Sequence, residues 1–184
     1  MTYPTRNLIL TALFAALTSI GALIMIPIGP APITLQLLFT IMSGIFLGAK
    51  YGALSQILYM LMGLAGLPVF AGGTGGFSSL FSPSFGYIIG FIIAAFVIGK
   101  LLEKKTNPTI GQIVLACALG TFIIYAVGYP YLYFVLSRVM GVPVTFSGLL
   151  KPAVLVFLPG DLLKIGIASI LGKKIVPIVK TATR

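Results

Sequence analysis

The sequence predicts an all-α membrane protein, a six-transmembrane-helix bundle with both termini cytoplasmic. Three observations support this fold class. Hydrophobic residues make up 59% of the 184 residues and charged residues 8%, whereas soluble domains carry roughly 25% charged residues. The mean hydropathy is +1.16, and the apolar residues form long runs separated by charged residues, prolines or glycines. The basic residues lie mostly at the ends of these runs, as they do beside a membrane.

The lengths of the runs define the elements, because a spanning helix needs about 17–25 mostly apolar residues. The first two runs are closed by Pro27 and Lys50. The next stretch, 51–99, carries no charge and is too long for one helix, so its glycines and prolines predict a loop over 68–84. Two further runs complete the chain. The expected helices are 7–26, 33–49, 51–67, 85–102, 110–136 and 152–174, all in a single integral membrane domain, 1–184.

Loop charges predict the orientation of the bundle. With six spans both termini lie on one side of the membrane, and that side collects nine basic residues against two on the other. Because lysine and arginine are retained in cytoplasmic loops, we expect cytoplasmic termini and outward-facing loops over 27–32, 68–84 and 137–150. The nine are Arg6, Lys50, Lys100, Lys104, Lys105, Lys173, Lys174, Lys180 and Arg184; the two are Arg138 and Lys151. On the outer side an interfacial aromatic belt is expected at Tyr125, Tyr129, Tyr131 and Tyr133.

The composition excludes several kinds of chemistry. The chain has no histidine, one cysteine (Cys117) and two carboxylates, so no ordinary zinc or iron site can be assembled. It contains no G-x-x-x-x-G-K-[ST] sequence that could hold a nucleotide. The net charge of +10 is distributed over segment ends, which favours membrane lipid over nucleic acid as the partner. We therefore expect no enzyme activity, no metal and no cofactor.

Asp161 is the most informative residue for function. It lies inside an apolar run, three positions before Lys164, so the two side chains share a face of a helix. An ionised group in hydrocarbon costs several kcal/mol unless it is paired or lines a polar cavity. Pro159 and Gly160 immediately precede it, at a point where a broken helix could restart. This combination favours a ligand site that contains Asp161 and Lys164, although an ion pair that only holds helices together is the alternative.

A second candidate site feature is the glycine-rich stretch at 66–80. It contains Gly73, Gly75 and Gly76, which permit backbone conformations with positive φ and can expose N–H groups to a ligand. It has no lysine and is not a phosphate loop. The alternative is a flexible or tightly packed loop without ligand contact.

Two features of the first helices complete the candidates. Gln36 lies in the outward part of the second helix and is a candidate ligand contact or a helix cap. Ala12 and Ala16 share a face of the first helix, where small side chains allow another helix to approach closely. That helix could belong to the same bundle or to a different membrane protein.

Three segments stand out: Gly-Leu-Pro-Val-Phe-Ala-Gly-Gly-x-Gly-Gly at 66–76, Gly-Tyr-x-x-Gly-Phe at 86–91 and Pro-Gly-Asp-Leu-Leu-Lys at 159–164. In this order and spacing they resemble the BioY family, the biotin-binding substrate components of energy-coupling-factor (ECF) vitamin transporters. The resemblance covers essentially the whole chain. It implies biotin as the transported ligand, an outward-facing pocket, and a partner module of one transmembrane coupling protein and two cytoplasmic ATPases. It also implies that Ala12 and Ala16 dock onto the coupling protein.

The chemistry of biotin suits the residues available. An aspartate accepts N–H bonds from a cyclic urea, and a lysine serves the urea carbonyl or the carboxylate. Phe77, Tyr87 and Phe91 could pack on the fused ring of biotin, and Ser79 is a further candidate polar contact with the ligand. The expected protein is therefore the high-affinity biotin-binding subunit of an ATP-driven uptake transporter, in the plasma membrane of a prokaryote. The alternatives are an ion- or proton-coupled secondary carrier for a small organic solute using Asp161, and a structural subunit without a ligand.

Overall fold

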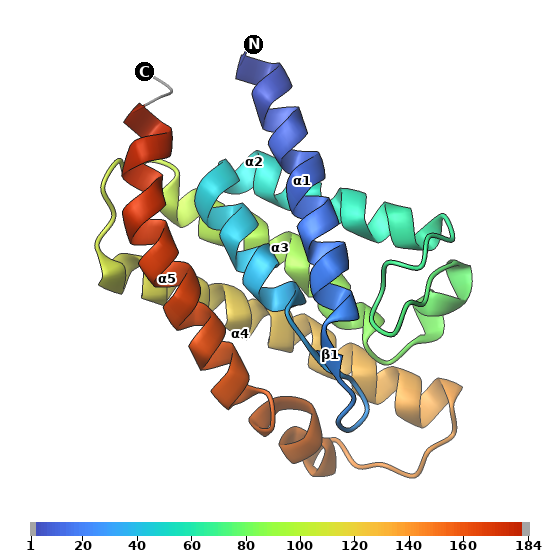
Figure 1. Cartoon of the computed structure of the whole chain (residues 1–184). Helices are drawn as coiled ribbons and strands as arrows, with labels where there is room; N and C mark the ends of the chain where they lie inside the picture. The colour runs from blue at the N-terminus through green and yellow to red at the C-terminus, as the bar shows by residue number, and fades with distance from the viewer. Residues whose placement is uncertain (1–2, 182–184) are drawn as a thin grey trace.

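The computed structural model describes residues 3–181, and it is almost entirely helical (Figure 1). Within these residues, five helices are long and apolar enough to cross a membrane. Short helical turns and a two-stranded hairpin connect them. The long helices are α1 (Tyr3–Leu23), α2 (Gln36–Leu64), α3 (Phe85–Leu102), α4 (Ile110–Phe134) and α5 (Leu158–Thr181). The strands are β1 (Met25–Ile26) and β2 (Ile33–Thr34), and the turns are η1 (Phe77–Phe81), η2 (Val135–Val139), η3 (Ser147–Leu149) and η4 (Lys151–Leu155). Arg184, assigned from the sequence to the cytoplasmic side, lies outside the described residues.

α2 is bent at Gly48, and this bend changes the helix count. The sequence predicts two helices over 33–49 and 51–67, whereas the structure has one helical element of 29 residues. Gly48 has φ 74° and ψ −173°, a conformation that is open to glycine and strained for other residues. The two arms therefore point in different directions (Figure 1).

The last two expected helices are also interrupted. The fifth was expected to run over 110–136, but the α-helix ends at Phe134 and continues as the π-helical turn η2. The sixth was expected to start at 152, but a π-helical turn, η4, precedes α5, which begins at Leu158. α5 therefore starts three residues before Asp161, after a turn at 156–157, and Pro159 and Gly160 lie inside its first turn rather than at the break.

Close backbone approach holds the bundle together. α2 packs against α1, α3 and α5, and α3 packs against α4. A β-carbon at Gly44 would lie 2.8 Å from the carbonyl oxygen of Ala95, and small residues allow such contacts between membrane helices. The start of α1 and the end of α5 lie at the same end of the molecule, and the β1–β2 hairpin lies away from that end (Figure 1).

The prediction of an interfacial aromatic belt is wrong for three of its four tyrosines. The hydroxyl of Tyr129 donates to the carbonyl of Phe146, that of Tyr131 donates to Leu80, and that of Tyr125 donates to Asp161. These side chains point into the protein because each hydroxyl finds an acceptor there, which is the usual arrangement for a buried tyrosine. The fourth, Tyr133, packs edge-to-face on Phe146 with ring centroids 5.3 Å apart.

Candidate ligand-binding site

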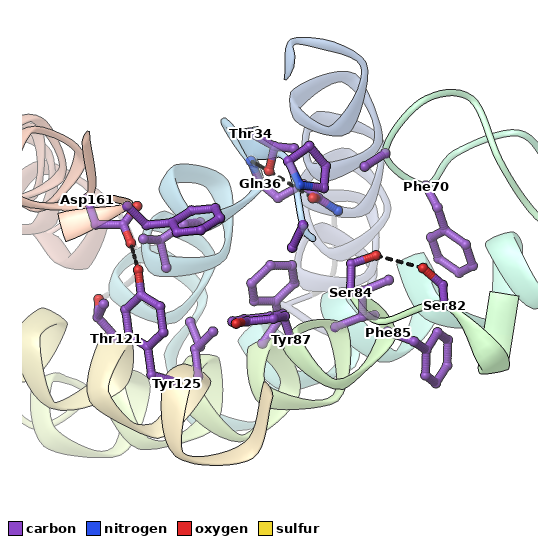
Figure 2. Close-up of a pocket in the computed structure, with 18 of the residues that line it drawn as sticks. Thr34, Gln36, Phe70, Ser82, Ser84, Phe85, Tyr87, Thr121, Tyr125 and Asp161 are labelled. Atoms are coloured by element: carbon purple, nitrogen blue, oxygen red, sulfur yellow. Dashed lines mark hydrogen bonds between the residues drawn. The ribbon is translucent and has the colours of Figure 1, made fainter. Parts of the chain in front are cut away.

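A cavity opens among the helices next to the β1–β2 hairpin (Figure 2). The space between its lining atoms is about 750 Å³, including the open mouth. Small-molecule pockets commonly combine apolar walls with a few placed polar groups. The polar lining residues are Thr34, Gln36, Thr74, Ser79, Ser82, Ser84, Tyr87, Thr121, Tyr125, Asp161 and Lys164, and the apolar ones are Ala31, Pro32, Leu37, Phe70, Ala71, Phe85, Ile88, Phe91, Ile124 and Phe157.

One end of the cavity is ionic. Asp161 and Lys164 are 5% and 6% exposed, and the ammonium of Lys164 lies 2.8 Å from Oδ1 of Asp161. The hydroxyl of Tyr125 donates to Oδ2 of the same carboxylate (Figure 2). Both carboxylate oxygens therefore have a partner, while Lys164 uses one of its three donors in its bond to Asp161. The pair is formally neutral and retains donors and lone pairs for a ligand.

The chain reaches this geometry through the start of α5. Pro159 occupies the first turn of the helix, where its missing N–H would have no helical partner in any case. Asp161 also lies in this first turn, where the partial positive charge of a helix N-terminus favours a carboxylate. Spacing of three residues then places Lys164 on the same face.

The other end of the cavity carries neutral polar groups. Thr34 donates to the side-chain carbonyl of Gln36 at 2.8 Å, and the amide nitrogen of Gln36 donates to Tyr59. Gln36 is 6% exposed, so its amide is oriented by these two partners. The hydroxyls of Ser82 and Ser84 lie 3.0 Å apart on the loop that leads into α3 (Figure 2).

Aromatic rings line the cavity along its length. Tyr87 packs edge-to-face on Tyr125 with ring centroids 6.1 Å apart, and its hydroxyl donates to the carbonyl of Ala153 at 3.1 Å. Phe91, on the same helix, is buried and lines the cavity. Phe70 packs edge-to-face on Phe85 with centroids 6.1 Å apart. This wall suits an apolar ring system between polar groups.

The structure brings six of the ten sequence-predicted ligand contacts into one cavity lining: Gln36, Ser79, Tyr87, Phe91, Asp161 and Lys164. The other four, Gly73, Gly75, Gly76 and Phe77, are not part of it. The N–H groups of Gly73 and Gly76 bond to the carbonyls of Phe70 and Gly63 at 3.0 and 2.7 Å, and Phe77 is 73% exposed. In this structure these N–H groups are used within the loop and its helix, and ligand contact by these four residues stays a prediction.

Sequence reasoning missed two residues at the ionic end. The sequence pattern predicts a lipid interface for Tyr125 and does not single out Thr121, four residues earlier on the same face of α4, although both line the cavity. A signal was present, because Thr121 is a polar residue inside a long apolar run and one helical turn from a tyrosine.

Ala12 and Ala16, the candidate docking residues of α1, do not line the cavity. Ala12 and Ala16 are exposed, whereas Ala15 and Ser19 face the bundle and are buried. Around the two exposed alanines, leucine and isoleucine side chains are also about half exposed: Leu8, Ile9, Leu13 and Ile20. The internal packing of α1 therefore uses Ala15 and Ser19 rather than Ala12 and Ala16.

Comparison with known proteins gives consistent results. The family model described as "BioY family" matches residues 1–181. The chain is 46% identical over 133 residues to "Probable biotin transporter BioY" of Lysinibacillus sphaericus, with 72% of this chain and 67% of the relative covered. It is 38% identical over 181 residues to "Biotin transporter BioY" of Rhizobium etli, with 93% of each covered. A crystal structure of "the S-component for biotin from an ECF-type ABC transporter" superposes with a TM-score of 0.80 at 33% identity, covering 95% of this chain and 94% of that one.

Proposed function

Because this chain belongs to the BioY family, we propose that it is the high-affinity biotin-binding subunit of an ATP-driven vitamin uptake transporter. It captures biotin from outside the cell and delivers it through a separate coupling protein and ATPases. The relatives are named biotin transporters, and the matching structure is an S-component for biotin. No observation favours an ion- or proton-coupled carrier over this function.

The observation that carries the proposal is the buried Asp161–Lys164 pair at the end of a cavity with an aromatic wall. Burying two charges is expensive even when they are paired, and a pair that only joined helices would not need to line a cavity. Biotin has a neutral cyclic urea, an apolar fused ring and a carboxylate tail, which correspond to the ionic end, the aromatic side chains and the neutral polar end of the cavity. The Asp161 and Lys164 side chains therefore act as ligand groups.

Charge balance orients biotin in this cavity. The Asp161–Lys164 pair sums to zero, so a ligand carboxylate placed there would leave a net negative charge in a buried site. A urea adds no charge, because its carbonyl accepts from Lys164 and its N–H groups donate to Asp161. The urea is therefore placed at the ionic end, and the carboxylate points toward the hydroxyls of Ser79, Ser82 and Ser84.

Isothermal titration of the purified protein with biotin, thiamine and riboflavin tests this function. We expect one biotin per chain and no heat from the other vitamins. Asp161→Asn should weaken biotin binding about 30-fold or more, since losing a charged hydrogen bond to a buried partner costs about 2–5 kcal/mol. Lys164→Ala should also weaken it, whereas the matched control Glu103→Gln, far from the lining, should bind normally. Binding of another vitamin with biotin silent would reject the proposal.

We also propose six membrane crossings in one domain over 1–184, with both termini in the cytoplasm of a prokaryotic cell. The bend at Gly48 supports the sixth crossing, because the two arms of α2 contact each other through Thr40 and Gln56. The basic residues support the orientation, nine against two. Single cysteines placed at Lys50 and at Gly141 in a Cys117→Ala background should be labelled from opposite sides of the membrane. Labelling of both from one side would contradict six crossings.

ATP-driven transport then requires other polypeptides, because this chain has no nucleotide-binding sequence. The exposed face of α1 around Ala12 and Ala16 is the proposed contact for the coupling protein, since small side chains let another helix approach closely. Ala12→Trp or Ala16→Trp should abolish uptake in cells with the complete module and leave biotin binding to the isolated chain intact. Leu115→Trp is the matched control, because Leu115 on α4 is 72% exposed and should face lipid. Loss of binding together with uptake would assign the alanines to internal packing.

A further inference from the structure

Thr121 carries a buried hydroxyl without a hydrogen-bond partner. Within residues 3–181, two buried side-chain oxygens have no such partner, those of Thr121 and Ser169. Thr121 is 6% exposed and lines the cavity, whereas Ser169 does not line it. Figure 2 shows Thr121 on α4 next to Tyr125 and below Asp161. A buried polar group without a partner is destabilising, so its retention calls for an explanation.

The local backbone does not satisfy this hydroxyl. A helical Ser or Thr can donate to the carbonyl four residues earlier. Thr18 does so to Phe14 at 2.8 Å, Ser19 to Ala15 at 2.9 Å and Ser137 to Tyr133 at 2.7 Å. Thr121 makes no such bond to Cys117, so its hydroxyl stays available at the cavity wall.

The neighbouring ionic groups do not satisfy it either. Oδ1 of Asp161 accepts from Lys164 and Oδ2 accepts from Tyr125. Because both Asp161 oxygens already have partners, the Thr121 hydroxyl remains available to donate to another acceptor and to accept from another donor. A urea offers both, one carbonyl and two N–H groups, and it adds no charge to the neutral pair.

We propose that the Thr121 hydroxyl is a ligand contact that hydrogen-bonds the urea of biotin, alongside Asp161 and Lys164. This inference rests on the proposed function and on the orientation that charge balance gives to the ligand. Thr121 selects ligands whose inner end is a neutral group with both donors and acceptors. A ligand with an apolar inner end leaves the hydroxyl unpaired and binds less tightly.

The test compares Thr121→Val with Thr121→Ser by titration with biotin and with its carboxyl methyl ester. Valine keeps the shape and removes the hydroxyl, so Kd should rise about 5- to 20-fold for both ligands, while serine should stay within about twofold of the wild type. The melting temperature of the ligand-free protein should not fall in Thr121→Val. Ser169→Ala, which removes the other unpaired hydroxyl outside the cavity, should leave Kd unchanged.

Each contrary outcome is distinct. Normal affinity of Thr121→Val, with Asp161→Asn still impaired, would overturn the Thr121 contact and leave the proposed function in place. A loss for biotin but not for the ester would move the contact to the carboxylate and overturn the urea assignment. A loss that accompanies a lower melting temperature of the ligand-free protein would make Thr121 structural. Absence of biotin binding by the wild type would contradict the proposed function and this inference with it.

Discussion

The amide nitrogen of Gln36 donates to the hydroxyl of Tyr59, although 23 positions separate these residues in α2. In a straight helix their backbones would lie about 34 Å apart at 1.5 Å per residue. The bond forms because α2 turns at Gly48 and its second arm approaches the first. The buried contacts Thr40 to Gln56, at 3.1 Å, and Ser43 to Gly52, at 3.5 Å, lie between this bond and the bend. The bend thus brings Tyr59 into contact with Gln36, which lines the cavity.

Tyr59 should position Gln36 for the ligand, so Tyr59→Phe should weaken biotin binding about 2- to 13-fold. The change removes the acceptor of the Gln36 amide, and one hydrogen bond is worth about 0.5–1.5 kcal/mol. Titration with biotin measures the effect. The control is Tyr51→Phe on the same arm, because Tyr51 is away from the cavity lining. Equal affinities of both variants and the wild type would show that the Tyr59 hydroxyl does not position Gln36 for the ligand.

Gln56 should stabilise the junction of α1 with both arms of α2. Its side-chain nitrogen lies 3.3 Å from the hydroxyls of Thr18 and Ser43, and its oxygen accepts from Thr40. Gln56→Leu leaves the buried Thr40 hydroxyl without this acceptor, so the free energy of unfolding should fall by about 1–3 kcal/mol. Unfolding in detergent micelles measures it. Gln112→Leu, at the exposed start of α4, removes one half of a capping box and should have a smaller effect. A larger loss in Gln112→Leu than in Gln56→Leu would refute the role of the network.

Much of the helical framework could be predicted from the sequence because charge and proline limit membrane spans. The range 85–102 is that of α3, and the start of α4 at Ile110 also agrees. The break in the long second element was placed at Lys50, because a charge marks the end of a span, whereas the structure bends at Gly48. Composition shows where a helix leaves the membrane, but only the backbone shows which residue takes up the turn.

The site could be predicted only in part. Asp161 and Lys164 are neighbours on one helix, so their spacing was sufficient to pair them. Tyr125 lies 36 residues before Asp161, and its contact depends on how α4 is rotated about its axis. In a membrane helix both the buried and the lipid-facing sides are apolar, so periodicity does not reveal that rotation. Thr121 stands out as a polar residue in an apolar run, but for the same reason the sequence does not show which side of α4 faces the cavity, and only the structure places Thr121 there.

Gly99 should be intolerant of a side chain. A β-carbon there would overlap backbone atoms of Gly48 and Ala49, so α3 meets the bend of α2 backbone to backbone. Gly99→Ala should therefore lower the free energy of unfolding by about 1–3 kcal/mol or more, the typical cost of overpacking. Gly111→Ala is the control, because a β-carbon at Gly111 has no atom within 4 Å. That change should be neutral or stabilise by up to about 1 kcal/mol. Unfolding of both variants in the same detergent measures the contrast, and equal effects would argue against close packing at the bend.

The contact of Glu103 with this bend predicts that the stability of the fold depends on pH. Its carboxylate lies 3.0 Å from the ammonium of Lys100 and accepts from the backbone N–H of Ala49 at 3.4 Å, directly after Gly48. The hydrogen bond from Lys100 is the main cause that holds the pKa of Glu103 below its usual value of 4.5. A carboxyl group whose pKa is lower in the folded state stabilises the fold above its unfolded-state pKa, and this contribution disappears as the pH falls through the folded-state pKa.

Glu103→Gln isolates that charge, because glutamine can still accept from Ala49. The wild type should be slightly more stable than the variant at pH 7, and the difference should shrink below about pH 4.5 as Glu103 takes up a proton. It should also shrink at high salt, because Lys100 is exposed and Glu103 partly so, and ions screen the pair. Unfolding of both proteins across this pH range, at two salt concentrations, measures the effect. A difference that is constant from pH 7 to below 4.5 would mean that the Glu103 charge does not stabilise the bend.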